Sequence, residues 1–185
     1  MRKIQFISTC SILVISIIFI AYTLQNNNSK SADNAPILSN EIVTTQPSND
    51  INLIDLTSSN NISVNFAEKP TVILFFTSWC PYCNEDAPKI VQLHKKYKSD
   101  INLFGINLVY RDDLQEVREY VKNYDIEYPI LLDESGSVYK KYGGSGFPSL
   151  YFFNSKGEII DQLVGSTDIE NIENSFKYLQ DNFSV

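Results

Sequence analysis

The sequence predicts an α/β fold in which a mixed central sheet is flanked by helices on both faces. From residue 51 onward, apolar segments of strand length alternate with longer amphipathic segments, a pattern typical of alternating strands and helices. This region begins with a strand–helix–strand order and ends with two strand-like segments around a turn and a helix. A parallel crossover followed by a hairpin implies both parallel and antiparallel neighbours in one sheet.

The first expected elements lead to the centre of the sheet. Residues 51–56 and 62–66 are predicted to form a leading hairpin. Residues 71–77 are a continuous apolar run, which is typical of a central strand covered on both faces. A helix is expected over residues 80–97, with one buried stripe at helical spacing. The stripe consists of Ala87, Ile90, Val91, His94 and Tyr97.

The later elements complete the alternation. Further strands are expected at residues 101–109, 129–132, 149–153 and 158–164. Further helices are expected at residues 112–123, 135–142 and 168–179. The first of these helices should turn four apolar side chains inward, namely Leu114, Val117, Tyr120 and Val121. Residues 154–157 have the composition of a hairpin turn, so we expect the last two strands to pair antiparallel.

Composition supports one globular domain with an appendage. The chain has 185 residues, of which 43% are hydrophobic, enough for a packed core. The formal net charge is −7, and no cluster of Lys and Arg offers a phosphate-binding surface. We therefore expect no binding to nucleic acid.

The N-terminal region predicts a membrane anchor and a tether. Residues 4–24 carry no charge and match the roughly 20 residues that span a bilayer. Arg2 and Lys3 precede this run, which predicts a cytoplasmic N-terminus and places the remainder in an extracytoplasmic, oxidising compartment. A cleaved signal peptide and a lipoprotein site at Cys10 are the alternatives. Residues 25–50 are polar and read as a flexible linker. We expect three parts: an anchor (1–24), a linker (25–50) and a folded domain (51–185).

Cys80 and Cys83 form a local pair where the central strand meets the following helix. At the first helical turn, two cysteines three positions apart can close a disulfide, and the unpaired amides of the helix N-terminus favour a thiolate at the leading cysteine. We expect Cys80 to be the exposed nucleophile and Cys83 to be the resolving thiol. A structural staple would gain only about 2 kcal/mol from so short a loop. A zinc site would need four ligands, and the sequence offers these two thiols and His94, which reads as a core-edge histidine.

Several motifs together resemble a thioredoxin-fold protein. They are the Trp-Cys-x-x-Cys motif after a strand, Pro88 within the helix, and Gly146, Phe147 and Pro148 before a strand. The leading hairpin, the anchor and a central helix–strand insertion resemble the membrane-anchored TlpA/ResA-like branch of thiol-disulfide oxidoreductases. The resemblance covers about residues 51–179.

The resemblance implies roles for individual residues. Pro148 matches the cis-proline that orients a substrate backbone, so a cis bond after Phe147 is expected, and Pro88 matches the proline that kinks the active-site helix. Trp79 is expected to pack beside the motif and shape the substrate surface, together with Pro81, Tyr82, Phe147 and Pro148. The Pro-Tyr pair is similar to glutaredoxin-type pairs, which leaves the redox direction open.

Asp86 matches the position where ResA-like proteins carry a Glu that assists proton transfer. The alternative is an ordinary acid in the first turn of a helix, where its charge is favourable. The buried Asp of cytosolic thioredoxins would fall at Leu74, which cannot accept a proton. Asp86 is therefore the candidate general base for Cys83.

The expected function is thiol-disulfide exchange with exported proteins, without a cofactor or metal. The resemblance implies a reductase with a CcdA-like membrane electron donor, and cytochrome c maturation is the best-known task of ResA. A disulfide-forming oxidase is the rival. A peroxiredoxin-like peroxidase would need a Pro-x-x-x-Thr-x-x-Cys pattern, which the sequence lacks. An SCO-like copper chaperone would need a CxxxC motif and a distal His, and the sequence lacks this pattern as well.

Overall fold

The computed structural model describes residues 51–183. The expected anchor at residues 4–24 and the linker at residues 25–50 lie outside these residues. Among the helices between residues 51 and 183, none has the length and apolar character that a membrane crossing requires.

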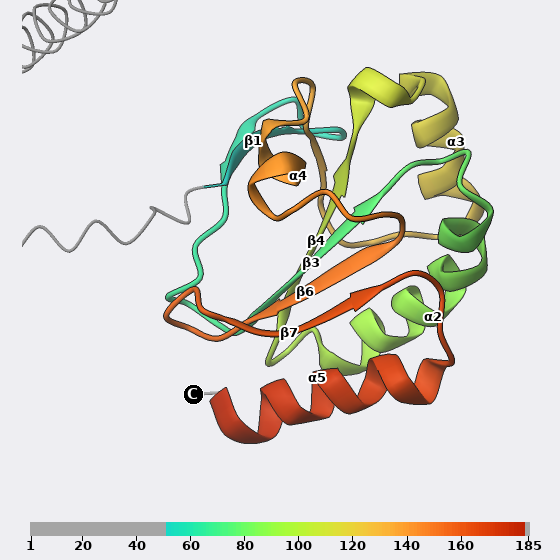
Figure 1. Cartoon of the computed structure of the whole chain (residues 1–185). Helices are drawn as coiled ribbons and strands as arrows, with labels where there is room; N and C mark the ends of the chain where they lie inside the picture. The colour runs from blue at the N-terminus through green and yellow to red at the C-terminus, as the bar shows by residue number, and fades with distance from the viewer. Residues whose placement is uncertain (1–50, 184–185) are drawn as a thin grey trace, which may run out of the picture. The chain divides into compact units, whose positions relative to one another are not determined.

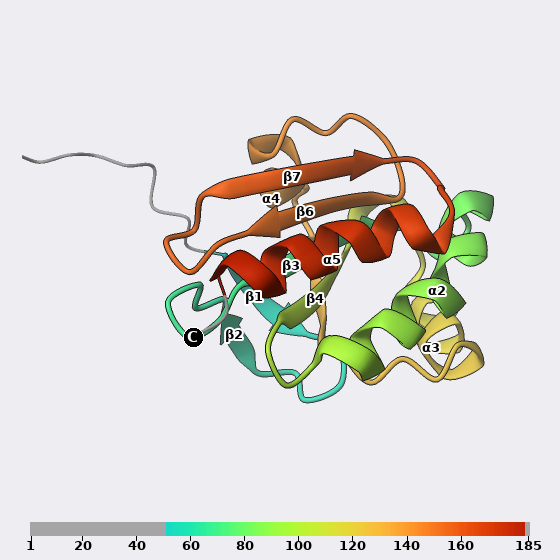
Figure 2. The ribbon, with the colours of Figure 1, turned by 90° about the horizontal axis from the view of Figure 1, so that it is seen from below.

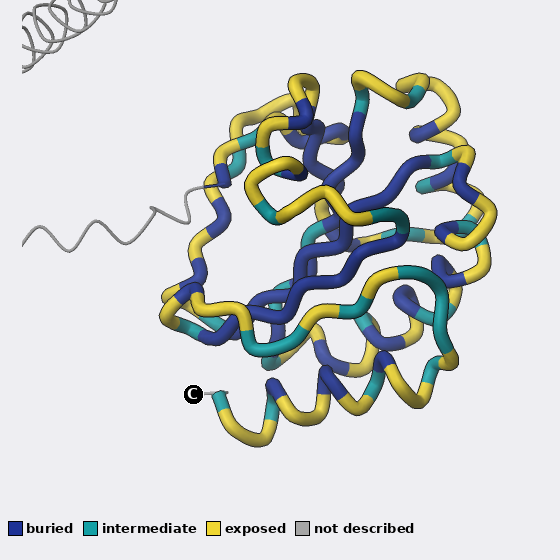
Figure 3. Tube along the Cα trace, in the orientation of Figure 1, coloured by how far each residue is buried: buried dark blue, intermediate teal, exposed yellow. Residues whose placement is uncertain are grey.

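Strand β3 (Thr71–Phe76) is the centre of the sheet, as expected from its apolar run. All six of its residues are buried. It pairs in parallel with β4 (Asn102–Asn107) on one side and antiparallel with β6 (Ser149–Phe153) on the other. A strand that is apolar at every position can be covered on both faces, and Figure 3 shows this buried centre in dark blue.

The sheet has seven strands and is mixed, as predicted. The strand order is β2-β1-β5-β4-β3-β6-β7, and Figure 1 shows the arrangement. The leading hairpin is formed by β1 (Asn52–Asp55) and β2 (Asn61–Ser63). It joins the sheet through β5 (Ile130–Leu132), while β7 (Ile159–Val164) pairs antiparallel with β6.

Helices cover both faces of the sheet. On one face, α2 (Pro81–Tyr97), α3 (Leu114–Asn123) and α5 (Ile169–Phe183) pack on a core that includes Val72, Leu74 and Phe76 of β3. Figures 1 and 2 show α2 and α5 side by side on this face, and in the view of Figure 1 they lie below the strands. On the other face, the short helix α4 (Ser137–Lys141) and the segment around β1 and β2 cover Ile73 and Phe75 of β3. The alternation along β3 thus supplies both cores.

Three details of the sequence prediction are wrong. Leu114, expected inward, is 41% exposed, because it is the first residue of α3, directly after the N-cap Asp113, at the exposed end of the helix. Leu93 is buried on α2, whereas His94, assigned to the buried stripe, is half-buried. The strand expected over residues 101–109 ends at Asn107, and a 3-10 helix, η1 (Val109–Arg111), follows.

Candidate active site

The paired cysteines lie at the N-terminus of α2, where the chain leaves β3. Cys80 is the N-cap residue with extended backbone dihedrals, and Pro81 occupies the first helical position. Proline is favoured there because its missing N–H needs no helical partner. No side chain caps this helix end, so its free amides face the segment that carries Cys80. Cys83 follows within the first turn.

Both cysteines are buried free thiols in the described part of the chain. Cys80 is 5% exposed and Cys83 is 2% exposed. The expectation that Cys80 is exposed is therefore wrong for this structure. The physical reason is that its sulfur faces another segment of the protein: Sγ lies 3.8 Å from the carbonyl oxygen of Phe147.

The segment opposite the cysteines contains the expected cis peptide bond between Phe147 and Pro148. Helix α4 holds this segment through Tyr139. The hydroxyl of Tyr139 accepts a hydrogen bond from the amide of Gly146 at 2.9 Å, and its ring stacks on Phe147 with centroids 4.9 Å apart. Gly146, Phe147 and Pro148 thus lie across from the cysteine pair.

Exposed side chains form a rim around the cysteines. Trp79 is 54% exposed and Tyr82 is 59% exposed, and Pro81 is also exposed. The indole Nε1 of Trp79 donates a hydrogen bond to the carbonyl oxygen of Arg111 at 2.8 Å. The guanidinium of Arg111 lies 5.7 Å from the ring centroid of Phe147. The rings of Trp79 and Phe147 and the cation of Arg111 therefore lie together beside Cys80.

A polar network that the sequence reasoning missed fixes the segment before Cys80. The carboxylate of Asp112 accepts hydrogen bonds from the amide of Ser78 at 2.6 Å and from the side chain of Asn107 at 2.7 Å. Asn84 donates to the carbonyl oxygen of Ser78 at 2.8 Å and accepts from the hydroxyl of Tyr124 at 2.9 Å. Tyr124, the C-cap residue of α3, lies four positions after the inward-facing Tyr120, and this helical spacing was the available signal that Tyr124 faces α2.

Cys83 is surrounded by groups that disfavour its thiolate. Burial raises the pKa of the Cys83 thiol, a hydrogen bond with Cys80 and the charges of Cys80 and Asp86 raise it further, and a backbone hydrogen bond with Thr77 lowers it. The hydroxyl of Tyr120 donates to the carbonyl oxygen of Cys83 at 2.9 Å. Tyr128 is also buried nearby, and its hydroxyl has no hydrogen-bond partner among the described residues. Deprotonation of Cys83 therefore needs assistance.

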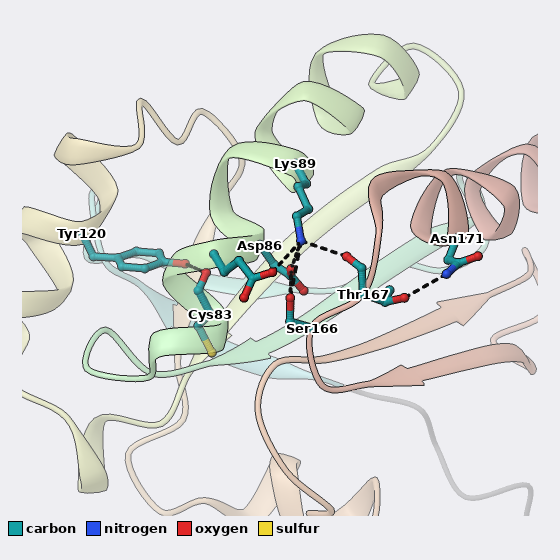
Figure 4. Close-up of polar contacts among 8 residues, drawn as sticks. Cys83, Asp86, Lys89, Tyr120, Ser166, Thr167 and Asn171 are labelled. Carbon is teal, nitrogen blue, oxygen red and sulfur yellow. Dashed lines mark hydrogen bonds and ion pairs between the residues drawn. The ribbon is translucent and has the colours of Figure 1, made fainter.

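Asp86 is fully buried and lies beyond the first turn of α2, so the alternative of an ordinary acid in the first helical turn is wrong. Its Oδ1 atom accepts hydrogen bonds from Lys89 at 2.8 Å and from Ser166 at 2.6 Å (Figure 4). Its Oδ2 atom is buried and has no hydrogen-bond partner within the described region. A carboxylate with one unengaged oxygen thus lies one helical turn beyond Cys83.

The other singled-out residues lie away from the cysteines or in the core. Pro88 is exposed within α2. His94 contacts the edge of Tyr128, and burial lowers its pKa. Leu74 is buried in the core. Between residues 51 and 183, no group of three His, Cys, Asp or Glu side chains could hold a metal ion.

The fold and the site define a class of protein, and comparisons with known proteins agree with it. A mixed sheet, a cysteine pair at a helix N-terminus and a cis-proline opposite it define a thioredoxin-like thiol-disulfide oxidoreductase. A family model described as the AhpC/TSA family matches residues 44–162, more than half of the chain. The chain belongs to this family, and its relatives are consistent with the TlpA/ResA-like branch.

Two curated relatives are named as thiol-disulfide oxidoreductases. Sporulation thiol-disulfide oxidoreductase A of Bacillus subtilis is 30% identical over 123 residues, which cover 65% of this chain and 74% of the relative. Thiol-disulfide oxidoreductase ResA of Bacillus thuringiensis is 27% identical over 116 residues, which cover 61% of this chain and 65% of that protein, slightly less than two thirds. The chain is thus a thiol-disulfide oxidoreductase of the ResA and StoA type.

Solved structures show the same fold. StoA from Bacillus subtilis aligns with a TM-score of 0.60 at 27% identity, covering 68% of this chain and 95% of StoA. A secreted Mycobacterium tuberculosis disulfide oxidoreductase, described as homologous to E. coli DsbE, aligns with a TM-score of 0.63 at 22% identity, covering 71% of this chain and 97% of the other. The second likeness supports the fold alone.

Proposed function

We propose that Cys80 and Cys83 exchange a dithiol for a disulfide with exported proteins, in the reducing direction. The observation that carries this proposal is the position of Cys80. It occupies the N-cap position of α2, and its sulfur lies 3.8 Å from the carbonyl oxygen of Phe147, the residue before the cis-proline Pro148. A thiolate at this point is stabilised by the helix amides, beside a backbone segment that a substrate can pair with.

The exchange proceeds in two balanced steps. The Cys80 thiolate attacks one sulfur of a substrate disulfide, so an intermolecular S–S bond forms and the second substrate sulfur leaves as a thiolate. The Cys83 thiolate then attacks the sulfur of Cys80. The Cys80–Cys83 disulfide forms, the mixed disulfide breaks, and the substrate leaves with both thiols. Two electrons pass from the protein to the substrate, and a membrane donor of the CcdA kind must return them.

Asp86 is the proposed proton acceptor for the second step. The pKa of the Cys83 thiol is raised, so its proton must be removed before it can attack, and a carboxylate with a free oxygen one turn away can take it. We assign substrate contact to the rim and the cis-proline segment. These residues are Trp79, Pro81, Tyr82, Phe147 and Pro148.

The proposed location is the outer side of the bacterial cell membrane. Residues 4–24 would anchor the chain with a cytoplasmic N-terminus. A random-coil tether of about 25 residues would give the domain a typical reach of roughly 25–30 Å. Cytochrome c maturation, which the resemblance to ResA implies, is the task that we propose. A disulfide-forming oxidase is the rival function, because the Pro81–Tyr82 pair does not indicate a direction.

Reduction of a model disulfide protein tests the proposal. The full chain in detergent should accelerate the reduction of insulin by dithiothreitol, and Cys80→Ser should abolish the acceleration. A parallel assay measures consumption of hydrogen peroxide with the same dithiol. Peroxide consumption that depends on Cys80, without acceleration of disulfide reduction, would assign a peroxidase function instead.

A further inference from the structure

We propose that Lys89 and Ser166 are positioning residues for the exchange reaction, because together they hold the buried Asp86 carboxylate by one oxygen and balance its charge beside Cys83. The inference rests on the proposed function of Asp86 as the proton acceptor. It concerns two residues that are not part of the cysteine motif, one on α2 and one in the loop between β7 and α5.

Lys89 is bound at several points. Its ammonium donates to Oδ1 of Asp86 at 2.8 Å and to the carbonyl oxygen of Thr167 at 2.8 Å. Weaker contacts reach Glu85 at 3.3 Å and Ser166 at 3.4 Å. The Lys89 side chain is 22% exposed, whereas that of Asp86 is 1% exposed. Lys89 therefore covers the carboxylate from the solvent side.

Ser166 completes the coordination of one carboxylate oxygen. Its hydroxyl donates to Oδ1 of Asp86 at 2.6 Å, so Oδ1 accepts two donors from two different elements. Oδ2 accepts none from the residues described. This asymmetry leaves the proton-accepting capacity on a single oxygen. Figure 4 shows Lys89 and Ser166 meeting at Asp86, with Thr167 bound to Lys89.

The loop that carries Ser166 is itself held in place. Thr167 accepts a hydrogen bond at its hydroxyl from the side chain of Asn171, 3.0 Å away in the first turn of α5. Lys89 binds the backbone of the same loop residue. We call the contacts of Lys89 and Ser166 with Asp86 the clamp. The clamp joins α2 to the N-terminal end of α5, and Asp86 and Ser166 are 80 residues apart in the chain.

Charge balance gives the clamp a chemical consequence. A buried, unpaired carboxylate is unfavourable, and the charge of Asp86 raises the pKa of Cys83. Although burial opposes it, the hydrogen bond and the charge of Asp86 raise the pKa of Lys89, so Lys89 stays cationic. Glu85 is the other charged group on this side of α2.

The other groups around Asp86 and Cys83 are hydroxyls and the thiol of Cys80. Ser166 and Thr167 come from the β7–α5 loop. Tyr120 and Tyr128 contribute hydroxyls near Cys83, and burial raises the pKa of both tyrosines, which keeps them neutral. Lys89 is thus the positive charge that limits the effect of Asp86 on Cys83.

The test measures the titration of Cys83 in the full chain in detergent. In a Cys80→Ser background, the rate of iodoacetamide alkylation is recorded against pH, which reports the thiolate of Cys83. Lys89→Met should move the midpoint upward by about one pH unit, because a lone carboxylate repels a thiolate more strongly than a neutral ion pair does. The upward shift requires that Lys89 is protonated where Cys83 titrates, and the hydrogen bond and the charge of Asp86 raise the pKa of Lys89.

Further variants separate the clamp from a purely structural role. Asp86→Asn should move the midpoint downward, and Lys89→Met should shift the midpoint less in the Asp86→Asn background than in the wild type, because Lys89 then has no carboxylate to hold. Lys89→Arg should restore the wild-type midpoint, and Ser166→Ala, which removes only a hydroxyl, should shift it upward by less than Lys89→Met. Lys95→Met, an exposed lysine on the same helix, is the matched control and should leave the midpoint unchanged.

The proposal is overturned if Lys89→Met and Ser166→Ala lower the melting temperature but leave the Cys83 midpoint unchanged. It is also overturned if Lys89→Met shifts the midpoint equally when Asp86 is Asn. The titration needs no disulfide substrate. Failure of the insulin assay would therefore reject the proposed function, whereas a normal titration response would still establish the clamp.

Discussion

Cys80 and Cys83 differ in their surroundings although they lie one helical turn apart. Cys80 caps α2 and faces the carbonyl of Phe147, whereas Cys83 is enclosed by the first turn and by Tyr120. Burial raises the pKa of the Cys83 thiol, so it is poorly suited to start the reaction. The asymmetry assigns the attacking role to Cys80 and the resolving role to Cys83.

A trapping experiment tests this assignment. Cys83→Ser should accumulate mixed disulfides with substrate proteins, because no resolving thiol can release them. Cys80→Ser should accumulate few, because the raised pKa of Cys83 keeps it in the less reactive thiol form near neutral pH. Non-reducing electrophoresis measures the adducts. Equal trapping by the two variants would show that the two cysteines do not have separate roles.

Asp86→Asn should slow the exchange by about tenfold or more near neutral pH, since a positioned base contributes at least that much to proton transfer. The rate is measured in the insulin assay as a function of pH. Glu85→Gln is the matched control, because Glu85 is the exposed neighbouring acid and should leave the rate unchanged. An unchanged rate for Asp86→Asn would remove Asp86 from the reaction.

Only part of the candidate active site was predictable from the sequence. The spacing of Cys80 and Cys83 and their place after a strand indicated the reactive pair. The burial of Asp86 was not predictable, because it depends on Lys89, three residues away, and on Ser166, 80 residues later in the sequence. Such a long-range contact has no local sequence signal.

At the scale of elements, α3 supports the reactive turn of α2. The hydroxyl of Tyr120 binds the carbonyl oxygen of Cys83, and its ring stacks on Phe76 at the end of β3, with centroids 5.1 Å apart. One side chain thus links α3, α2 and the central strand.

Tyr120→Phe should lower the free energy of unfolding by about 1 kcal/mol, because the aromatic packing remains and one buried hydrogen bond is lost. Denaturant unfolding of the full chain in detergent measures the change. Tyr178→Phe is the control, since Tyr178 is largely exposed on α5 and should give no change. A loss no larger than that of the control would mean that this hydrogen bond contributes nothing to stability.

An ion pair joins α2 and α5 at the other end. Hydrogen bonds from Lys96 and Tyr97 lower the pKa of Glu173 from 4.5 to about 2. Because the pKa is lower in the folded state, this contribution to stability is present above about pH 4.5 and is lost as the pH falls toward 2.

Glu173→Gln should therefore show a smaller drop in melting temperature than the wild type between about pH 5 and pH 2. Thermal unfolding followed by circular dichroism measures both. Glu170→Gln, an exposed acid in the first turn of the same helix, should retain the wild-type pH dependence. Parallel melting curves for wild type and Glu173→Gln would contradict the assignment.

Elements with strong periodicity were predictable, and their ends were not. The central strand and α2 follow directly from a continuous apolar run and from a helical stripe. The strand before η1 stops early because Asp112 binds both Asn107 and Ser78 and turns the chain, a tertiary effect that hydrophobicity does not encode.

At the scale of the whole molecule, strand order assembles the site. Cys80 follows β3, and Pro148 directly precedes β6. The two strands are antiparallel neighbours, with Phe75 opposite Ser149, so the end of β3 adjoins the start of β6. This pairing brings Cys80 and Phe147, 67 residues apart, into contact. Local pattern indicated both segments, but only the resemblance to a known fold indicated that they meet.

The reduction potential of the Cys80–Cys83 pair is a direct test of the proposed reducing function. The full chain in detergent is equilibrated in redox buffers, and the fraction of disulfide is measured at each potential. We expect a value near or below that of thioredoxin, about −270 mV, because a reductase must donate electrons to substrate disulfides. A value near that of DsbA, about −120 mV, would make the protein an oxidant and would contradict the proposed reducing function.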